Sequence, residues 1–430
     1  MILIKAGTLV NPVKEVFEKV DIIIEKGKIK EILPHGKIVD FGVFTRIINA
    51  SDMLVVPGLV DMHVHLREPG HEYKEDINSG TLAAVAGGFT DIACMPNTDP
   101  VNDCASVTEF ILSQSETFGH CRVHPIACIT IAQKGERLTE FGDIKKTGAV
   151  GVSDDGKSVL NSDLMRRALE YARYHGLTVI SHCEDPYLSE GGVMHEGKVS
   201  TQIGLPGIPS VCEEIMVARD ILLAKLTGCP VHIAHVSTSG SVDLIRMAKD
   251  QGIPVTAETA PHYFSLDHRA VIDYDTNAKV NPPLRTEEDV EAIKEGLKDD
   301  TIDVIATDHA PHSPLEKEVE FDKAEFGMIG LQTAVPLTLE LVRQGVLDLS
   351  KAIKKLSYNP ASILGIPRTQ MEANEKADMT IIDSEHEYLF TEEHILSKSK
   401  NSPFMGKVLK GIVRFTIVEG EIRFELDINS

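Results

Sequence analysis

The chain has 430 residues, of which 42% are hydrophobic and 25% charged, a composition typical of soluble globular proteins with a large core. Acidic residues outnumber basic residues by 65 to 43, so the formal net charge is −22. Such an acidic protein would repel a phosphate backbone, which argues against nucleic acid as a partner.

The first residues lack the basic start and long apolar run of a signal peptide, and no uncharged apolar stretch is long enough to span a bilayer. The seven cysteines are scattered and include no Cys-x-x-Cys pair, which argues against a disulfide framework. We therefore expect a cytoplasmic protein with no membrane partner.

Short β-type runs open the chain at residues 1–4 and 20–24, and similar runs return near its end at 378–382 and 411–418. The segment between them has a different pattern. We therefore predict that residues 1–56 and 366–430 form one small composite β domain, and that residues 57–365 form a separate α/β domain.

The middle segment alternates short apolar runs with helical patterns, for example at 164–175 and 241–249. Candidate strands lie at 58–62, 90–95, 122–126, 150–153, 178–181, 231–234, 254–257 and 303–306. Eight strands with helices between them predict a (β/α)8 barrel of the TIM type. The alternative is an open doubly wound sheet, but the glycine-rich first turn of dinucleotide-binding sheets is missing.

Residues that could bind a metal ion follow the ends of separate predicted strands. They are His63, His65, Asp154, Asp155, His182, His235 and Asp308. Active sites of such barrels form at the carboxyl ends of the strands, and a His-x-His pair presents both rings on one strand face. Imidazole and carboxylate groups are ligands of Zn²⁺ and similar cations. A single histidine here would more often be structural, but the whole set predicts a metal site.

Neighbouring residues are interpreted differently. His232 lies three residues before His235, so strand alternation predicts that it faces the opposite way and has a packing role. His262 follows another strand and fits either a structural role or one that orients a metal ligand. Cys183 directly follows His182 and could compete for zinc as a thiolate, although a buried, inert cysteine is the simpler interpretation.

Several motifs, in this order, resemble the amidohydrolase superfamily in its class I dihydroorotase form. They are Asp61-Met62-His63-Val64-His65-Leu66-Arg67-Glu68-Pro69-Gly70, Gly87-Gly88-Phe89-Thr90, Met95-Pro96-Asn97-Thr98, Asn281-Pro282-Pro283-Leu284-Arg285 and Ala306-Thr307-Asp308-His309-Ala310-Pro311-His312. The resemblance covers residues from about 57 to 361, and the flanking β segments resemble that family's composite domain. Each motif is moderately specific alone, and together they are a strong signal.

The resemblance implies reversible hydrolysis of the ring amide of dihydroorotate to N-carbamoyl-aspartate, a step of de novo pyrimidine synthesis. It implies one or two Zn²⁺ ions and these metal ligands: His63, His65, Asp155, His182, His235 and Asp308. Asp308 would also carry the proton between a metal-activated water and the leaving ring nitrogen.

The resemblance further implies these substrate contacts: His65, Arg67, Asn97, Asn281, His312 and the backbone around Phe326 and Gly327. The residue chemistry agrees for two of them. The Arg67 guanidinium can hold a carboxylate through paired hydrogen bonds. Asn97 can both donate and accept, although it could also be only a turn residue after Pro96.

The chain departs from related patterns at two places. Hydantoinases carry a carbamylated lysine on the fourth strand, whereas this chain has no lysine at that place and Asp155 is the candidate for bridging two metals. This favours a dihydroorotase over a hydantoinase. In addition, Glu325 stands where the family pattern has proline, so we expect a looser loop over about 313–330.

Two alternatives to dihydroorotase activity are also compatible with the sequence. One is a hydantoinase or allantoinase, whose substrates lack the ring carboxylate. The other is a catalytically silent partner of aspartate transcarbamoylase, although such chains tend to lose ligands and this one keeps the full set. The resemblance also implies a homodimer, with a complex with aspartate transcarbamoylase as a further expectation.

Overall fold

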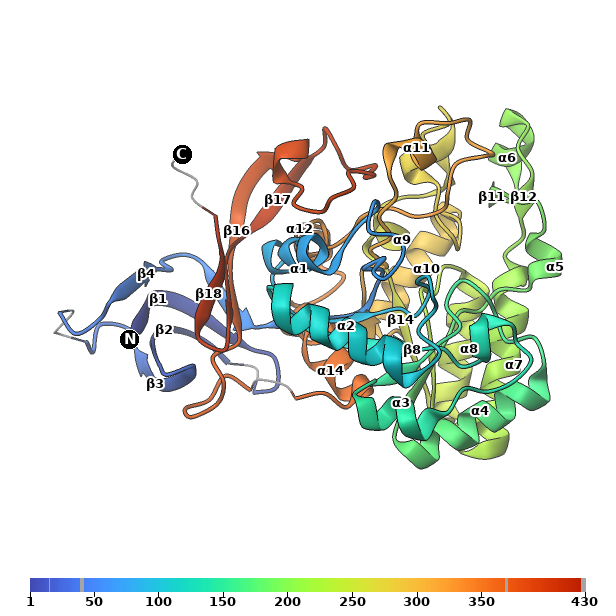
Figure 1. Cartoon of the computed structure of the whole chain (residues 1–430). Coiled ribbons are helices and arrows are strands. Elements are labelled where there is room, and N and C mark those ends of the chain that lie inside the picture. Colours follow the sequence, from blue (N-terminus) through green and yellow to red (C-terminus); the bar gives the residue numbers. More distant parts are fainter. Residues whose placement is uncertain (15, 39–41, 368–369, 427–430) are drawn as a thin grey trace.

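The computed structural model describes residues 1–14, 16–38, 42–367 and 370–426. A barrel of strands and helices forms one side of the molecule, and a strand-rich domain lies beside it (Figure 1). Strands from the two ends of the chain, blue and red in the figure, lie together in that second domain.

Eight parallel strands form the barrel, in the same order as they occur along the chain. They are β6 (Leu59–Val64), β7 (Phe89–Cys94), β8 (Arg122–Ala127), β9 (Gly151–Val152), β10 (Thr178–Ser181), β13 (Val231–Ile233), β14 (Val255–Thr259) and β15 (Val304–Ile305). A parallel bridge between Val64 and His309 joins the first strand to the segment after the last one. The predicted (β/α)8 barrel is therefore confirmed, and each predicted strand overlaps an observed one.

Helices follow the strands and cover the outside of the barrel (Figure 1). They are α1 (Ile77–Ala86), α2 (Ala105–Phe118), α3 (Phe141–Thr147), α4 (Ser162–His175), α7 (Val211–Thr227), α8 (Ser239–Asp250), α10 (Glu287–Lys298) and α12 (Ala334–Arg343). Their ends show the expected chemistry. Asn161 caps α4 through its side chain and Gly176 ends that helix in the left-handed conformation.

Shorter elements decorate this frame. They are α5 (Pro186–Ser189), β11 (Met194–His195), α6 (Lys198–Ile203), β12 (Gly207–Ile208), α9 (Pro261–Ser265), α11 (Pro314–Lys317), α13 (Leu349–Leu356) and α14 (Tyr358–Leu364). Small and medium apolar side chains such as Val60, Ala93 and Ala234 fill the barrel interior, and residues of α14 pack against them. The barrel is thus a packed core that presents a site only at its mouth.

The second domain is built on an eight-stranded sheet to which both chain ends contribute. Its strands are β1 (Ile2–Asn11), β2 (Val16–Glu25), β3 (Lys28–Pro34), β4 (Arg46–Asn49), β5 (Leu54–Pro57), β16 (Met379–Leu389), β17 (Val408–Val418) and β18 (Glu421–Glu425). Antiparallel pairing of β5 with β16 joins the two ends of the chain. The domain boundaries near residues 56 and 365 stay a prediction.

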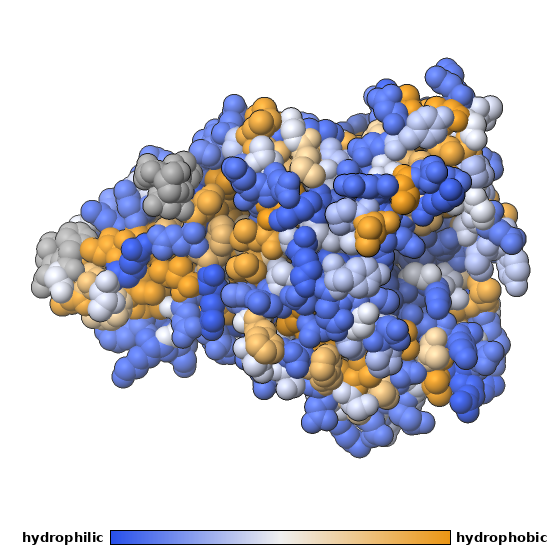
Figure 2. Space-filling model, turned by 45° about the horizontal axis from the view of Figure 1, so that its top comes forward, coloured by the Kyte–Doolittle hydropathy of each residue, from blue (hydrophilic) through white to orange (hydrophobic). Residues whose placement is uncertain are grey.

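Hydrophobic residues gather on the surface of this strand-rich domain, whereas the visible surface of the barrel is mostly polar (Figure 2). Phe17 and Ile47 are among its exposed apolar residues. Among the described residues, no helix combines the length and the apolar character that crossing a membrane requires.

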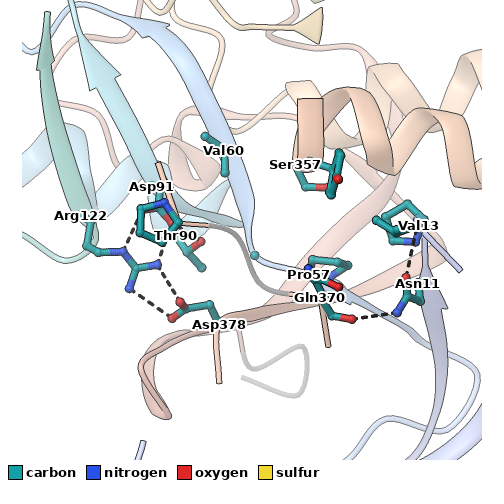
Figure 3. A pocket seen from close by; sticks show the side chains of 14 residues that line it. Asn11, Val13, Pro57, Val60, Thr90, Asp91, Arg122, Ser357, Gln370 and Asp378 are labelled. Carbon is teal, nitrogen blue, oxygen red and sulfur yellow. Dashed lines mark hydrogen bonds and ion pairs between the residues drawn. The ribbon is translucent and has the colours of Figure 1, made fainter. Parts of the chain in front are cut away.

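Arg122, at the start of β8, links the barrel to the strand-rich domain (Figure 3). Its Nε lies 2.8 Å from Asp91 Oδ1 on β7, and its Nη2 lies 2.8 Å from Asp378 Oδ2, just before β16. The adjoining cavity has a volume of about 20 Å³, room for about one water molecule. The junction around Arg122 therefore has a structural ion-pair network, and the cavity beside it is too small for a substrate.

Replacing Arg122 with methionine is expected to lower the free energy of unfolding by about 3–5 kcal/mol, because two buried carboxylates would lose their counter-charge. Urea denaturation of the whole chain measures the loss. Arg166→Met is the matched control, since Arg166 pairs with a half-exposed Glu170 and should contribute less than about 1 kcal/mol. Equal losses in both variants would contradict the assigned role.

The same network predicts a pH dependence. Burial opposes ionisation of Asp91, yet hydrogen bonds from His124 and Arg122 lower its pKa from 3.8 to about 2. A carboxyl group whose pKa is depressed on folding stabilises the fold fully above its ordinary pKa. Stability from Asp91 should therefore be lost as the pH falls from about 4 towards 2, and the loss should shrink in Arg122→Met.

Candidate metal centre

The structure brings the sequence-predicted metal ligands together at the carboxyl ends of the barrel strands. Two groups of side chains each have ligand atoms within 4.8 Å of one another. The first group is His63, His65 and Asp155, and the second is Asp155, His182 and His235. Asp155 belongs to both groups, so its carboxylate is the one shared element.

Asp155 lies at the centre of the cluster. Its Oδ1 is 3.4 Å from His63 Nε2, 3.6 Å from His182 Nδ1 and 3.7 Å from His235 Nε2. Its Oδ2 is 3.6 Å from His65 Nε2. The carboxylate therefore lies close to histidines of both groups, as a ligand shared by two cations would.

Two buried atoms of the cluster suit the role of metal ligands. His63 Nε2 and Asp155 Oδ1 are buried and have no hydrogen-bond partner among the described residues. Buried polar groups are normally paired, so these two atoms need another partner. Burial alone would lower the pKa of His63, but Asp155 and Glu258 hold it well above its usual value. The site therefore favours a positive charge, and its nitrogen and oxygen donors suit a divalent metal.

Asp308 lies beside the first group rather than inside either group. Its Oδ1 is 3.1 Å from His65 Nε2 and 3.6 Å from His63 Nε2. Its side chain is 12% exposed, whereas His63 is fully buried. Burial would raise the pKa of Asp308, but His65 and His63 hold it below its usual value. The carboxylate is thus ionised, close to the cluster and accessible from the barrel mouth.

Three residues of the site have a left-handed backbone, which is uncommon for residues other than glycine. They are Arg67 (φ 63°), His235 (φ 34°) and Asp308 (φ 48°). Each stands just beyond the end of its barrel strand. Strained backbone of this kind tends to concentrate at functional sites, where the surrounding structure holds it in place.

Arg67 lies next to the metal ligands and contacts His312. Its Nη2 is 3.2 Å from His312 Nε2, and its Nε donates to the Pro311 carbonyl at 3.2 Å. The other ring nitrogen of His312 lies 3.4 Å from the buried Lys74 ammonium. Burial, Arg67 and Lys74 lower the pKa of His312. Lys74 is itself paired with Glu316 at 2.7 Å, so the Arg67 guanidinium is the positive charge that makes this edge of the site cationic and suited to an anionic group.

The two predicted asparagine contacts lie at different places in the site. Asn97 Oδ1 is 2.9 Å from His65 Nδ1, and its Nδ2 is 3.4 Å from Asp155 Oδ2. Asn97 therefore contacts residues of the first metal group, which goes beyond a turn role. Asn281 instead donates to Glu184 Oε2 at 2.7 Å, and that carboxylate also lies 2.9 Å from His182 Nε2.

Phe326 and Gly327 lie on the loop after α11. A Cβ added to Gly327 would come within 3.0 Å of His312 Cδ2, so this backbone adjoins the cationic edge of the site. The looser loop expected from Glu325 stays a prediction, and the backbone of Glu325 makes two hydrogen bonds in the structure. The Glu325 amide donates to the Glu316 carbonyl, and its own carbonyl accepts from the Lys317 ammonium at 2.8 Å.

Sequence reasoning missed Glu258 and misplaced His232. Glu258 Oε1 is 2.6 Å from His63 Nδ1, and Glu258 Oε2 is 3.2 Å from His232 Nε2. The packing role predicted for His232 is therefore wrong, because its ring takes part in a buried hydrogen-bond chain that ends on His63. The available signal was a single carboxylate at the end of an otherwise uncharged, buried strand, 255–259.

The remaining candidates have the following surroundings. Asp154 accepts hydrogen bonds from Thr130 and takes no part in either metal group. Cys183 is buried with its sulfur 3.7 Å from Asp220 Oδ2, and burial raises the pKa of its thiol. It therefore matches the inert interpretation. His262 is buried, its Nε2 has no hydrogen-bond partner in the described part of the chain, and burial lowers its pKa to about 4.

The sequence is similar to known proteins over nearly its whole length. A family model described as "Dihydro-orotase-like" matches residues 52–241. A dihydroorotase of Geobacter metallireducens is 53% identical over 424 residues, which cover 99% of both chains. A dihydroorotase of Pelotomaculum thermopropionicum is 55% identical over 422 residues and 98% of both chains.

Solved structures show the same fold at lower sequence identity. An L-hydantoinase (dihydropyrimidinase) from Arthrobacter aurescens superposes with a TM-score of 0.86 at 23% identity, over 98% of this chain and 95% of that one. That likeness concerns the fold alone, whereas the identity with the two dihydroorotases extends over nearly the whole sequence. The chain belongs to the dihydroorotase family.

Proposed function

We propose that this chain is a dihydroorotase of class I, which hydrolyses the ring amide of dihydroorotate to N-carbamoyl-aspartate and catalyses the reverse cyclisation in pyrimidine synthesis. The observation that carries the proposal is the position of Arg67 and His312 directly beside two metal-ligand groups that share Asp155. The metal groups suit amide hydrolysis, and the cationic edge suits the carboxylate that distinguishes dihydroorotate from plain cyclic amides.

The residues proposed to hold Zn²⁺ are His63, His65, Asp155, His182, His235 and Asp308. When bound, zinc lowers the pKa of water to about 7 and polarises a carbonyl group. Two groups around one shared carboxylate support two ions, since each group offers three donors. Elemental analysis of the purified chain tests both the identity and the number of the ions.

The chain's own residues would orient the substrate and move one proton. Arg67 would hold the ring carboxylate, with Asn97, Asn281, His312, His65 and the Phe326–Gly327 backbone as further contacts. Asp308 would accept the proton of the attacking water and return it to the leaving ring nitrogen. Its position 3.1 Å from His65 and its partial exposure support this role.

A hydantoinase is the competing function, and a paired assay separates the two. Arg67→Ala is expected to lower kcat/KM for dihydroorotate by about 100-fold, or roughly 3 kcal/mol, because a buried charge pair with the carboxylate is lost. Turnover of hydantoin, which has no carboxylate, should change little. Equal losses for both substrates, or a wild-type chain that prefers hydantoin, would contradict the proposal.

The expected homodimer, the complex with aspartate transcarbamoylase and the cytoplasmic location stay predictions. The full set of candidate ligands supports an active enzyme over a silent partner. Sedimentation of the chain alone and with transcarbamoylase measures the assembly. Inactivity of the metal-loaded chain in the presence of transcarbamoylase would favour the silent partner.

A further inference from the structure

Two lysines are almost fully buried beside the loop that carries Phe326 and Gly327. Lys279 is 2% exposed and Lys317 is 3% exposed. In the described part of the chain, the hydrogen bonds of both ammonium groups go to backbone carbonyl oxygens rather than to carboxylates. A charge buried in this way needs an explanation, because leaving water is costly for an ammonium group.

Lys317 uses its full donor capacity on this loop and its neighbour. An ammonium group has three N–H donors. Its Nζ lies 2.8 Å from the Glu325 carbonyl oxygen, 2.9 Å from that of Gly327 and 3.3 Å from that of Lys279. The Lys317 side chain therefore connects the backbone on both sides of Phe326 to the separate segment that contains Lys279.

Lys279 completes the attachment from that segment. Its Nζ donates to the carbonyls of Phe321 at 2.8 Å and Asp322 at 3.1 Å, and it lies 4.6 Å from the centre of the Phe326 ring. That distance suits a cation–π contact. The backbone of Lys279 also accepts a hydrogen bond of 2.9 Å from the Gly327 amide.

Gly327 transmits this attachment to the site. Its φ is 139°, and a Cβ there would approach Ala310 Cβ to 2.8 Å and His312 Cδ2 to 3.0 Å. Asn401 donates to the Gly327 carbonyl at 3.1 Å and accepts from the His312 amide at 3.1 Å. Movement of the Gly327 carbonyl would therefore change the shape of the site beside His312.

We propose that Lys317 and Lys279 are positioning residues, whose ammonium groups hold the backbone of residues 321–327 against His312 so that the substrate-binding edge is formed before substrate arrives. The role in substrate binding rests on the proposed function. An apolar pair of similar size could fill the same space without the cost of desolvating two charges. Only hydrogen-bond donors can hold the carbonyls, and preformed geometry is what a binding edge requires.

Lys317→Met removes the donors while it keeps most of the side-chain volume. The KM for dihydroorotate is expected to rise about tenfold or more, because the substrate-binding edge is no longer held in place. The kcat should change by less than about threefold, because the metal ligands and Asp308 are unaltered. Metal content should equal that of the wild type. Lys317→Arg keeps the charge and the donors, so its KM should lie between that of Lys317→Met and that of the wild type. An unchanged KM in folded Lys317→Met would overturn the proposal.

Hydrogen exchange of the metal-loaded chain tests the attachment without any assay of activity. Amides of residues 321–327 should exchange about tenfold faster in Lys317→Met, because their backbone is released locally. If wild-type chain fails to turn over dihydroorotate but this exchange still accelerates, the proposed function is wrong and the attachment stands. Unchanged exchange would overturn the attachment itself.

Lys355→Met is the matched control. Lys355 is 1% exposed, and its ammonium donates to Asp300 and to the Ile302 carbonyl, before strand β15 and away from the loop. Its replacement should cost stability but leave KM and the exchange of 321–327 unchanged. Lys279→Met is a second test variant. If both loop variants fail to fold while Lys355→Met folds, the two lysines determine the fold rather than one loop, which contradicts the proposal.

Discussion

Asp308→Asn is expected to lower kcat by about 10²–10⁴-fold while the chain keeps its metal, because an amide oxygen cannot take up the proton that a carboxylate accepts. The amide matches the carboxylate in shape, so the contact of 3.1 Å with His65 Nε2 should be preserved. Steady-state turnover of dihydroorotate and elemental analysis of the same sample measure both effects. Activity within tenfold of the wild type would exclude Asp308 as the proton carrier.

Asp154→Asn is the matched control for that experiment. Asp154 also follows a barrel strand, but its carboxylate accepts hydrogen bonds from Thr130 and lies outside both metal groups. Its activity should stay within about threefold of the wild type, since no group of the site changes. A large loss in this variant would mean that kcat responds to general disturbance of the barrel mouth.

Asp155→Ala is expected to remove metal and activity together. Replacing a residue that only supports a ligand lowers metal affinity by up to about 100-fold, so the loss of a ligand itself should exceed that value. Asp155 is the one residue of both groups, so its loss breaks each of them. The three histidine nitrogens within 3.7 Å of Oδ1 would also lose their counter-charge. Metal content at the wild-type level would contradict the shared-ligand role.

Single-group variants extend this test to the number of ions. His65 belongs only to the first group and His235 only to the second. If two ions bind, His65→Ala and His235→Ala should each lose about one ion per chain, whereas Asp155→Ala should lose both. If one ion binds, one of the histidine variants should keep the wild-type content.

Much of the site was readable from local sequence. His63 lies in β6 and His65 directly follows its last residue, Val64, so the strand period still predicts both rings on the same side. Asp155, His182 and His235 each follow a short apolar run, and parallel strands of a barrel present their carboxyl ends at one mouth. These inferences need only the strand period and the order of the elements along the chain. The structure brings the same side chains together in the two ligand groups.

Other features depend on contacts between distant segments. The packing role predicted for His232 assumed that the strand continues as far as His235. In the structure, β13 ends at Ile233 and His235 has a φ of 34°. Beyond the strand end the two-residue period no longer applies. Glu258 could be connected to His63 only through the fold, since 195 residues separate the two side chains.

The sequence by itself determined the barrel, the set of candidate metal ligands and the family resemblance, because strand period, strand order and motif spacing are local properties. Asp155, the bridging candidate of the sequence analysis, lies in both ligand groups. Only the tertiary structure decided that Glu258 supports His63. It also decided that Lys279 and Lys317 hold the loop after α11. Those roles arise from distances between segments far apart in the chain, and burial gives them their strength by removing competing water.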